Sequence, residues 1–374
     1  MIFIIYVVNS GDTLFSIADR TGVPIWKITY DNQLVNQDQL VVGQALLILP
    51  PGESGSIRGD MYVTGYAYPF VEPYILEQAF PAINELLVFS YGFTFEGELV
   101  PPLTDDTWMI TAAYEEGIEP ILVLTPFSEG AFNNQLVKVL SENLEVQERL
   151  IENLMETVVE KGFAGVDVDF EYILPEDRVG YAEFVGRLRE RMNAQGYQVS
   201  VALAPKTSAD QPGLLYEGMD YALLGRNADH VFLMTYEWGY TYSEPMAVAP
   251  INKVRQVVEY ALTEIPREKI LMGIPNYGYD WPLPYEKGVT KARLIGNVEA
   301  VRIAAENGAA IQFDEVAMSP HFTYTRDGIA HEVWFEDVRS IEAKLNMARD
   351  FGLLGVGYWN LMRPFRANWL LLEK

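Results

Sequence analysis

The chain has 374 residues, of which 49% are hydrophobic and 21% charged, so it can bury a large core and is not disordered. Its formal net charge of −25 excludes nucleic acid and anionic membrane surfaces as partners, because both require basic patches. It contains no cysteine, which excludes disulfides and thiol chemistry, and its three histidines are too scattered to suggest a zinc site.

The first residues show no signal peptide, because Met1–Val8 has neither a basic start nor a small-residue cleavage site. No apolar run reaches the length of a membrane span. We therefore expect a protein that is used in the cell that makes it, or that leaves without a cleaved signal.

Residues 1–50 predict a small β-α-α-β unit. A strand at Ile4–Val8 is followed by a turn and helix cap at Ser10–Thr13 and by apolar residues at helical spacing. A second helix is predicted over Pro24–Tyr30, and a closing strand over Leu40–Leu49. The Pro, Gly and Ser content of residues 51–60 predicts a short linker that acts as a spacer and is not packed.

This unit resembles a LysM domain. The resemblance rests on Tyr6-Val-Val, Ser10-Gly-Asp-Thr-Leu14, Ile17-Ala18, Asn32 and Val42-Gly-Gln-Ala-Leu46. It implies binding of glycans that contain N-acetylglucosamine, in a groove beside the loop after Tyr30 and beside Gly11, Asp12, Thr13 and Leu14. The alternative is a small folded module that binds no ligand.

Residues 61–374 alternate apolar strand-like runs with helical stretches, which predicts a (β/α)8 barrel. The eight predicted strands lie near 61–66, 86–93, 119–125, 163–171, 198–205, 230–236, 269–277 and 354–359. Between the seventh and eighth strands, residues 281–335 break the alternation and predict a small α+β insertion at the barrel mouth. Residues 133–160 predict two helical pieces.

The fourth predicted strand carries Asp167, Asp169 and Glu171 at every second position, so the three acids share one face. Like charges this close cannot all stay ionised, so at least one pKa must rise. A protonated acid beside a carboxylate suits cleavage of a glycosidic bond. The alternatives are the solvent face of an ordinary antiparallel strand, or a divalent-cation site.

Polar and aromatic residues lie at the ends of other predicted strands, where a barrel collects its catalytic groups. A sugar needs apolar faces for stacking and hydroxyls or carboxylates for hydrogen bonds. For any one aromatic residue alone, core packing is the competing interpretation. The predicted substrate-binding residues are Tyr66, Tyr91, Asn276, Tyr277, Glu237 and Trp359, with Tyr236 beside the acids.

This part of the chain resembles the family 18 glycoside hydrolases. The signature Asp-Gly-x-Asp-x-Asp-x-Glu appears as Ala164–Glu171, the Met-x-Tyr motif as Met234-Thr-Tyr236, and the eighth-strand Trp as Trp359. Two positions depart from the family pattern: Ala164 replaces the first Asp, and Glu237 replaces the usual Asp after the Tyr.

The resemblance implies substrate-assisted catalysis with no metal and no cofactor. Glu171 is then the general acid and base, and Asp169 holds the acetamido group of the substrate. Asp167 adjusts the protonation of Asp169, Tyr236 hydrogen-bonds the acetamido group, and Trp359 forms the floor of the subsite.

A LysM module joined to such a barrel resembles the spore cortex-lytic and spore-coat glycosidases of spore-forming bacteria. This resemblance implies peptidoglycan as partner, location at the spore coat or cell wall, synthesis in the mother-cell cytoplasm, and possible spore-coat protein partners. The alternatives are a chitinase or chitooligosaccharide hydrolase, a non-catalytic glycan-binding protein, and a morphogenetic spore protein.

Overall fold

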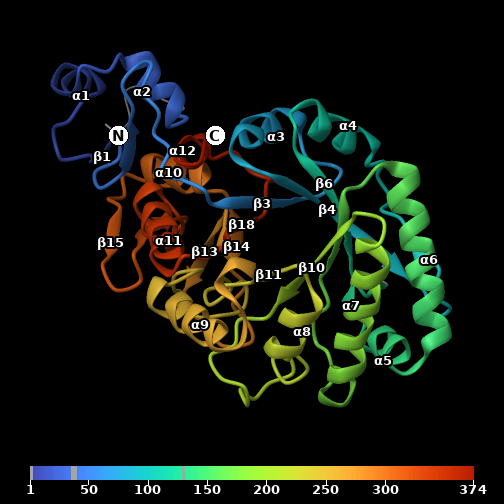
Figure 1. Ribbon diagram of the computed structural model, residues 1–374. Coiled ribbons are helices and arrows are strands. Elements are labelled where there is room, and N and C mark those ends of the chain that lie inside the picture. The colour runs from blue at the N-terminus through green and yellow to red at the C-terminus, as the bar shows by residue number, and fades with distance from the viewer. Residues whose placement is uncertain (1–2, 35–39, 129–130) are drawn as a thin grey trace.

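The computed structural model describes residues 3–34, 40–128 and 131–374 (Figure 1). Its N-terminal unit has the expected β-α-α-β order, with β1 (Ile4–Val7), α1 (Leu14–Thr21), α2 (Ile25–Asp31) and β2 (Ala45–Ile48). β1 and β2 pair antiparallel. β2 is shorter than predicted because Gly43 adopts a left-handed φ of 84° and turns the chain just before it. Residues 35–39 lie outside the described part.

Eight parallel strands form a closed barrel, as predicted, because β3 pairs with both β4 and β18. Their interior and exterior faces are buried, which explains the apolar runs in the sequence. The strands are β3 (Tyr62–Ala67), β4 (Glu85–Phe93), β6 (Glu119–Leu124), β9 (Gly165–Val168), β10 (Gln198–Leu203), β11 (His230–Leu233), β12 (Ile270–Pro275) and β18 (Gly355–Trp359).

Helices surround this barrel (Figure 1). They are α3 (Pro73–Ala79), α4 (Thr107–Glu115), α5 (Asn134–Glu142), α6 (Leu144–Lys161), α7 (Arg178–Asn193), α8 (Tyr221–Asn227), α9 (Ile251–Glu264), α11 (Val338–Phe351) and α12 (Arg366–Leu370), with short 3-10 turns η1 (Phe80–Ala82), η2 (Pro175–Asp177) and η3 (Arg267–Lys269). The two predicted helical pieces are α5 and α6, which separate at Asn143, whose side chain caps α6. No helix in the described residues is long and apolar enough to cross a membrane.

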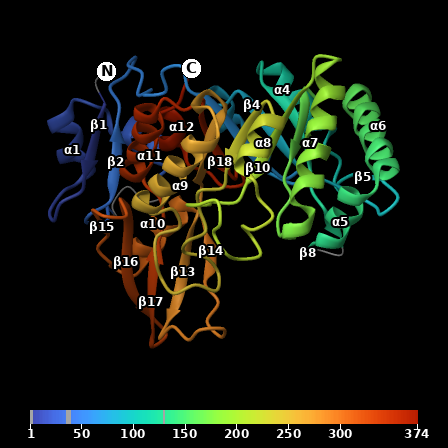
Figure 2. The same cartoon turned by 60° about the horizontal axis from the view of Figure 1, so that its bottom comes forward.

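Short strands in the loops of the barrel form β5 (Leu99–Val100) and the hairpin of β7 (Phe127–Ser128) and β8 (Ala131–Phe132). The predicted insertion is a five-stranded antiparallel sheet that extends beyond the barrel (Figure 2). Its elements are β13 (Gly278–Leu283), β14 (Arg293–Ile295), α10 (Asn297–Glu306), β15 (Gln312–Asp314), β16 (Ser319–Arg326) and β17 (Ile329–Trp334).

Residues 55–58 of the segment predicted as an unpacked spacer are packed against the barrel, while residues 51–54 are exposed. The Ile57 N–H donates to the Leu371 carbonyl at 2.8 Å, and both residues are buried. The guanidinium of Arg58 is also buried, and it donates to the carbonyls of Met61 and Ala82. The prediction failed because the Pro, Gly and Ser content of a segment indicates how flexible the chain is, but not which parts of the folded protein it contacts.

The N-terminal unit packs against the insertion and the C-terminal helix. Val41 belongs to the apolar core of the insertion, and the Ile311 N–H donates to the Val42 carbonyl at 2.9 Å. A Cβ on Gly43 would lie 1.8 Å from the Ile311 carbonyl oxygen. On the other side, the Arg366 guanidinium stacks on the Tyr30 ring. The N-terminal unit, the insertion and the barrel therefore form one packed structure.

Candidate active site

The three acids lie at the carboxyl end of β9, inside the barrel mouth. β9 ends at Val168, three residues earlier than predicted, but the Asp169 N–H still donates to the Leu124 carbonyl at 2.9 Å. β9 is a central parallel strand with buried residues on both faces. This excludes the interpretation of Asp167 as part of a solvent-facing antiparallel strand.

Asp167 is completely buried and has two hydroxyl donors, one from Tyr66 at 2.9 Å and one from Ser200 at 2.6 Å. Burial raises the pKa of Asp167 to about 6, although the two hydrogen bonds act in the opposite direction. The hydroxyl groups satisfy this carboxyl inside the protein, so it does not depend on a ligand.

Asp169 is buried between the other two acids, and its Oδ1 has no hydrogen-bond partner among the described residues. Burial, followed by the charges of Glu171 and Asp167, raises the pKa of Asp169 well above its ordinary value. A buried polar atom without a partner at the edge of a cavity is available to a ligand. Asp169 lines that cavity together with Glu171.

Glu171 is half-buried at the cavity wall. Burial, followed by the charge of Glu237, raises the pKa of Glu171 to about 7. A carboxyl group with this pKa is partly protonated at neutral pH, so it can give a proton and take one back. The site therefore contains a proton donor whose neighbour, Asp169, has a buried oxygen without a partner among the described residues.

The cavity above these acids measures about 590 Å³ and is mainly aromatic. The ring of Trp359, at the end of β18, is held by edge contacts with Phe89 at 5.0 Å and Tyr66 at 5.5 Å. The aromatic residues that line the cavity are Tyr66, Tyr68, Phe89, Phe127, Phe132, Tyr172, Tyr216, Phe232, Tyr236, Tyr240 and Trp359.

Tyr236 and Glu237 follow β11 and line the same cavity. Burial raises the pKa of Tyr236 well above its ordinary value, so its phenol stays neutral and can donate a hydrogen bond. Glu237 is exposed as a residue, but its carboxylate accepts hydrogen bonds from the buried Tyr277 at 2.6 Å and Tyr279 at 3.1 Å. The loss of water around this carboxylate raises its pKa.

Three predicted substrate-binding residues do not line the cavity. Tyr91 is buried with its hydroxyl on Asp106, because the register of β4 shifts between Val88 and Tyr91 and turns the side chain away from Phe89. The buried Asn276 amide donates to the Asn360 and Arg363 carbonyls and so fixes the loop after β18. Tyr277 does not line the cavity but donates a hydrogen bond to Glu237, which does.

Sequence reasoning missed several residues of the cavity wall. Tyr68 and Phe89 contact the Trp359 ring, with centroid distances of 6.1 and 5.0 Å. Tyr68 lies just beyond the end of the first predicted strand, so its position could have identified it, whereas Phe89 lies within the second predicted strand. Phe132 lies in the two-residue strand β8 and Tyr240 lies in a loop, and neither segment is long enough to show a periodic pattern.

The predicted glycan-binding loop of the N-terminal unit is ordered by its own side chains. The Asp12 carboxylate accepts hydrogen bonds from the Asn9 N–H at 2.8 Å and the Tyr6 hydroxyl at 2.7 Å, which lower its pKa to about 2. Thr13 caps α1. Leu14 is buried in the core of the unit and Gly11 forms the turn, while the polar side chains of Asp12 and Thr13 are hydrogen-bonded within the unit, Asp12 also to Arg20.

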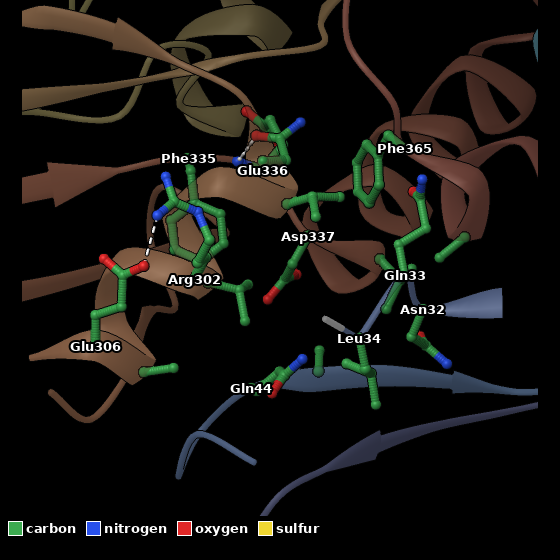
Figure 3. A pocket seen from close by; sticks show the side chains of 17 residues that line it. Asn32, Gln33, Leu34, Gln44, Arg302, Glu306, Phe335, Glu336, Asp337 and Phe365 are labelled. Atoms are coloured by element: carbon green, nitrogen blue, oxygen red, sulfur yellow. Dashed lines mark hydrogen bonds and ion pairs between the residues drawn. The ribbon is translucent and has the colours of Figure 1, made fainter. Parts of the chain in front are cut away.

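A separate cavity of about 260 Å³ lies where the N-terminal unit meets the insertion (Figure 3). Gln33, Leu34 and Gln44 contribute one wall, and Arg302, Glu306 and Phe335 contribute another. Asp167, Asp169 and Glu171 do not line this cavity.

The barrel, the three acids and the aromatic cavity define a glycoside hydrolase. Residues 127–363 match Glycosyl hydrolases family 18, and residues 6–49 match the LysM domain. The chain belongs to family 18 of the glycosyl hydrolases and carries an N-terminal LysM domain, which confirms both resemblances.

Among the relatives is the cortical fragment-lytic enzyme of Bacillus subtilis, which is 37% identical over 99% of this chain and 97% of its own length. The putative sporulation-specific glycosylase YdhD of Bacillus subtilis is 32% identical over 99% of this chain and 87% of its own length. The crystal structure of the Bacillus cereus spore cortex-lytic enzyme SleL superposes with a TM-score of 0.93 at 32% identity, covering 100% of this chain and 98% of the other.

A chitinase from Chromobacterium violaceum is structurally similar with a TM-score of 0.78 at 25% identity. It covers 83% of this chain and 98% of its own. The similarity to the spore enzymes therefore includes the LysM domain and the whole barrel, while the chitinase matches a smaller part of the chain.

Proposed function

We propose that this glycoside hydrolase cleaves spore cortex peptidoglycan at the β-1,4 bond after N-acetylglucosamine, with retention of configuration. The observation that carries the proposal is the row Asp167, Asp169 and Glu171, of which the last two line an aromatic cavity and the first is buried beneath it. Similarity to cortical fragment-lytic enzymes along nearly the whole chain supports the substrate.

In the proposed mechanism, Glu171 gives its proton to the glycosidic oxygen while the acetamido oxygen of the same sugar attacks the anomeric carbon. The C–O bond to the leaving sugar breaks, and an oxazolinium-like intermediate forms. Glu171, now ionised, takes a proton from water, whose oxygen attacks the anomeric carbon and reopens the ring. Two inversions at this carbon give net retention, a substrate-assisted exception to the two-carboxylate scheme.

The neighbouring residues stabilise the charge and fix the geometry. The unpaired Oδ1 of Asp169 is available to the acetamido N–H, and the charge of Asp169 balances the cationic intermediate. Tyr236 donates a hydrogen bond to the acetamido oxygen, which sets its angle of attack. Trp359 offers a ring face to the sugar, and Asp167 influences Asp169 through the shared protonation of the pair.

The LysM domain is proposed to bind the same class of glycan through the loop that contains Asp12 and Thr13. The protein would then be held at the spore cortex or the cell wall, where its substrate is. Spore-coat proteins as partners stay a prediction from resemblance alone.

The test is digestion of purified cortex peptidoglycan and of colloidal chitin, with mass spectrometry of the new reducing ends. The proposal expects fragments that end in reducing N-acetylglucosamine from cortex, and none with Glu171→Gln. Cleavage of chitin alone would favour the chitinase alternative. Binding of cortex without any product would leave a non-catalytic glycan-binding protein.

A further inference from the structure

A second cavity adjoins the catalytic cavity on one side of Glu171 and measures about 330 Å³. Asp169 and Trp359 line the first cavity alone, and the residues that line both cavities are Glu171, Leu215, Tyr216, Met234, Tyr236 and Glu237. The remaining walls of the second cavity come from the loop after β10, with Pro205, Thr207 and Gln211, and from Trp238 and α9, with Lys253 and Gln256.

The position of this cavity relates it to the leaving group, if the proposed function holds. The sugar that reacts must lie where Asp169 and Trp359 meet it, in the first cavity. Glu171 protonates the bond at the far end of that sugar, so the leaving sugar begins on the other side of Glu171. The second cavity opens from that side, because it contains Glu171 and neither Asp169 nor Trp359.

The walls of the second cavity carry the carboxyl groups of Glu171 and Glu237 on the barrel side, and a basic group on the side of α9. Lys253 is the basic residue among them, and the described residues form no ion pair with it. Lys253 lies in the first turn of α9, a 14-residue helix without a side-chain cap, so the positive end of the helix adds to its charge. This basic site is notable in a chain of net charge −25, near Glu171 and Glu237.

Amide donors accompany the charge. The Oε1 of Gln211 accepts hydrogen bonds from the Thr207 N–H at 2.7 Å and the Thr207 hydroxyl at 3.1 Å. This fixes the carboxamide and leaves its NH2 group as the part that can bind a ligand. Gln256 follows Lys253 by three residues, so the two side chains lie on the same face of α9.

We propose that this cavity binds the free carboxylate of a 3-O-lactyl substituent, on a muramic acid without peptide in the leaving-group position, with Lys253 as its ionic partner. The inference rests on the proposed function and deepens it, because it names which muramic acids of a strand this site prefers: where a peptide is attached, the lactyl carboxyl is an uncharged amide. A chitin residue carries only a hydroxyl at the same carbon. A muramic lactam has no free carboxylate, so it gains nothing from Lys253.

The experiment uses three substrates and the full-length protein. Glycan strands freed of peptides by an amidase carry a lactyl carboxylate on each muramic acid, and the same strands after conversion to methylamides carry none. Chitohexaose is the third substrate. Lys253→Met is compared with Lys138→Met, which removes an exposed lysine from α5, paired with Glu142 on the same helix.

We expect Lys253→Met to lower kcat/KM about fivefold on the carboxylate strands, the effect of losing one partly exposed ion pair. The kcat/KM of Lys253→Met on the methylamide strands and on chitohexaose should differ from wild type by less than twofold. Lys138→Met should leave kcat/KM unchanged on all three substrates. Titration of the strands into Glu171→Gln and into Glu171→Gln/Lys253→Met should show the same difference in Kd without turnover.

The outcomes separate this inference from the proposed function. A wild-type protein that neither cleaves nor binds the strands overturns both. A wild-type protein that cleaves them, with Lys253→Met unchanged or equally impaired on all three substrates, overturns the carboxylate site and leaves the proposed function intact.

Discussion

Asp167, Asp169 and Glu171 occupy successive positions on one face, yet their surroundings differ. Asp167 has two hydroxyl donors, Asp169 has a free oxygen, and Glu171 reaches the cavity wall. Carboxyl groups this close share protons, so the measured titration will belong to the group as a whole. Asp169 also lines the cavity, so the proposed acid role of Glu171 rests on its less buried position at the cavity wall and on its pKa of about 7.

The first prediction concerns the pH dependence of catalysis. Glu171 must be protonated to act, so kcat/KM should fall as the pH rises through about 7, its pKa. The charge of Glu237 raises this pKa, and Glu237→Gln removes that charge. The alkaline limb of the kcat/KM profile should therefore move to lower pH. An unchanged or higher limb would show that Glu237 does not act on Glu171 electrostatically.

The second prediction compares two buried tyrosines that both donate to an aspartate. Tyr66 binds Asp167 in the active site, and Tyr91 binds Asp106 outside the barrel. Tyr66→Phe should lower kcat about tenfold with little change in KM, the effect of roughly one lost hydrogen bond. Tyr91→Phe should lower the melting temperature and leave kcat unchanged. Equal kcat for both variants would contradict the assigned position of Tyr66.

At this scale the sequence predicted that the acids, Tyr236 and Trp359 lie together at the barrel mouth. The prediction was possible because the alternation of side chains along a strand, and the position of the strand end, fix the direction of each side chain. It could not predict Tyr91, because a register shift inside β4 reverses the alternation and leaves no mark in the composition. It also could not show that Asn276 satisfies carbonyls of a loop 84 residues away in the chain.

At the scale of elements, α11 is held by an ion pair that is removed from water. Lys344 donates to Glu336 at 2.8 Å, and both side chains have 0% exposure. Burial raises the pKa of Glu336, and the ammonium of Lys344 opposes that rise. Such a pair adds little to the net stability, but removal of one member destabilises the protein because the other charge stays buried without a partner.

The third prediction follows from this pair. Lys344→Met leaves Glu336 buried without its partner, so the free energy of unfolding should fall by about 3–5 kcal/mol in urea titrations. The double variant Lys344→Met/Glu336→Gln should recover part of the loss, because no uncompensated charge remains. If the single variant were as stable as the wild type, the pair would not be buried in solution.

The eight barrel strands were predictable from their apolar runs, since parallel strands are buried on both faces. Their ends were less predictable. β9 stops at Val168 where its ladder with β6 and β10 ends, while the apolar pattern continues to Phe170. The apolar run indicates which residues are buried, and the buried residues continue beyond the last hydrogen-bonded residue of the strand.

At the scale of the whole molecule, the fourth prediction tests the contact between the LysM domain and the insertion. Gly43→Ala places a Cβ 1.8 Å from the Ile311 carbonyl oxygen, whereas Gly22→Ala meets nothing within 4 Å. Both glycines have a left-handed φ, which costs each variant roughly 1–2 kcal/mol. Only Gly43→Ala should therefore speed proteolysis at residues 51–60, and calorimetry should show a separate LysM transition. Equal behaviour of the two variants would contradict this interface.

The packing of the LysM domain on the barrel also bears on how a polymer is cut. A flexible tether would let the cleft search many bonds around an anchored sugar, with a local concentration set by the length of the tether. Here Val42 and Gly43 hold the LysM domain against the insertion, so the cleft cannot move freely around the sugar that the domain binds. The distance between the glycan held by the LysM domain and Glu171 is then fixed. Bonds at a set number of sugars from the bound glycan should therefore be cleaved first, and the early products should have similar lengths.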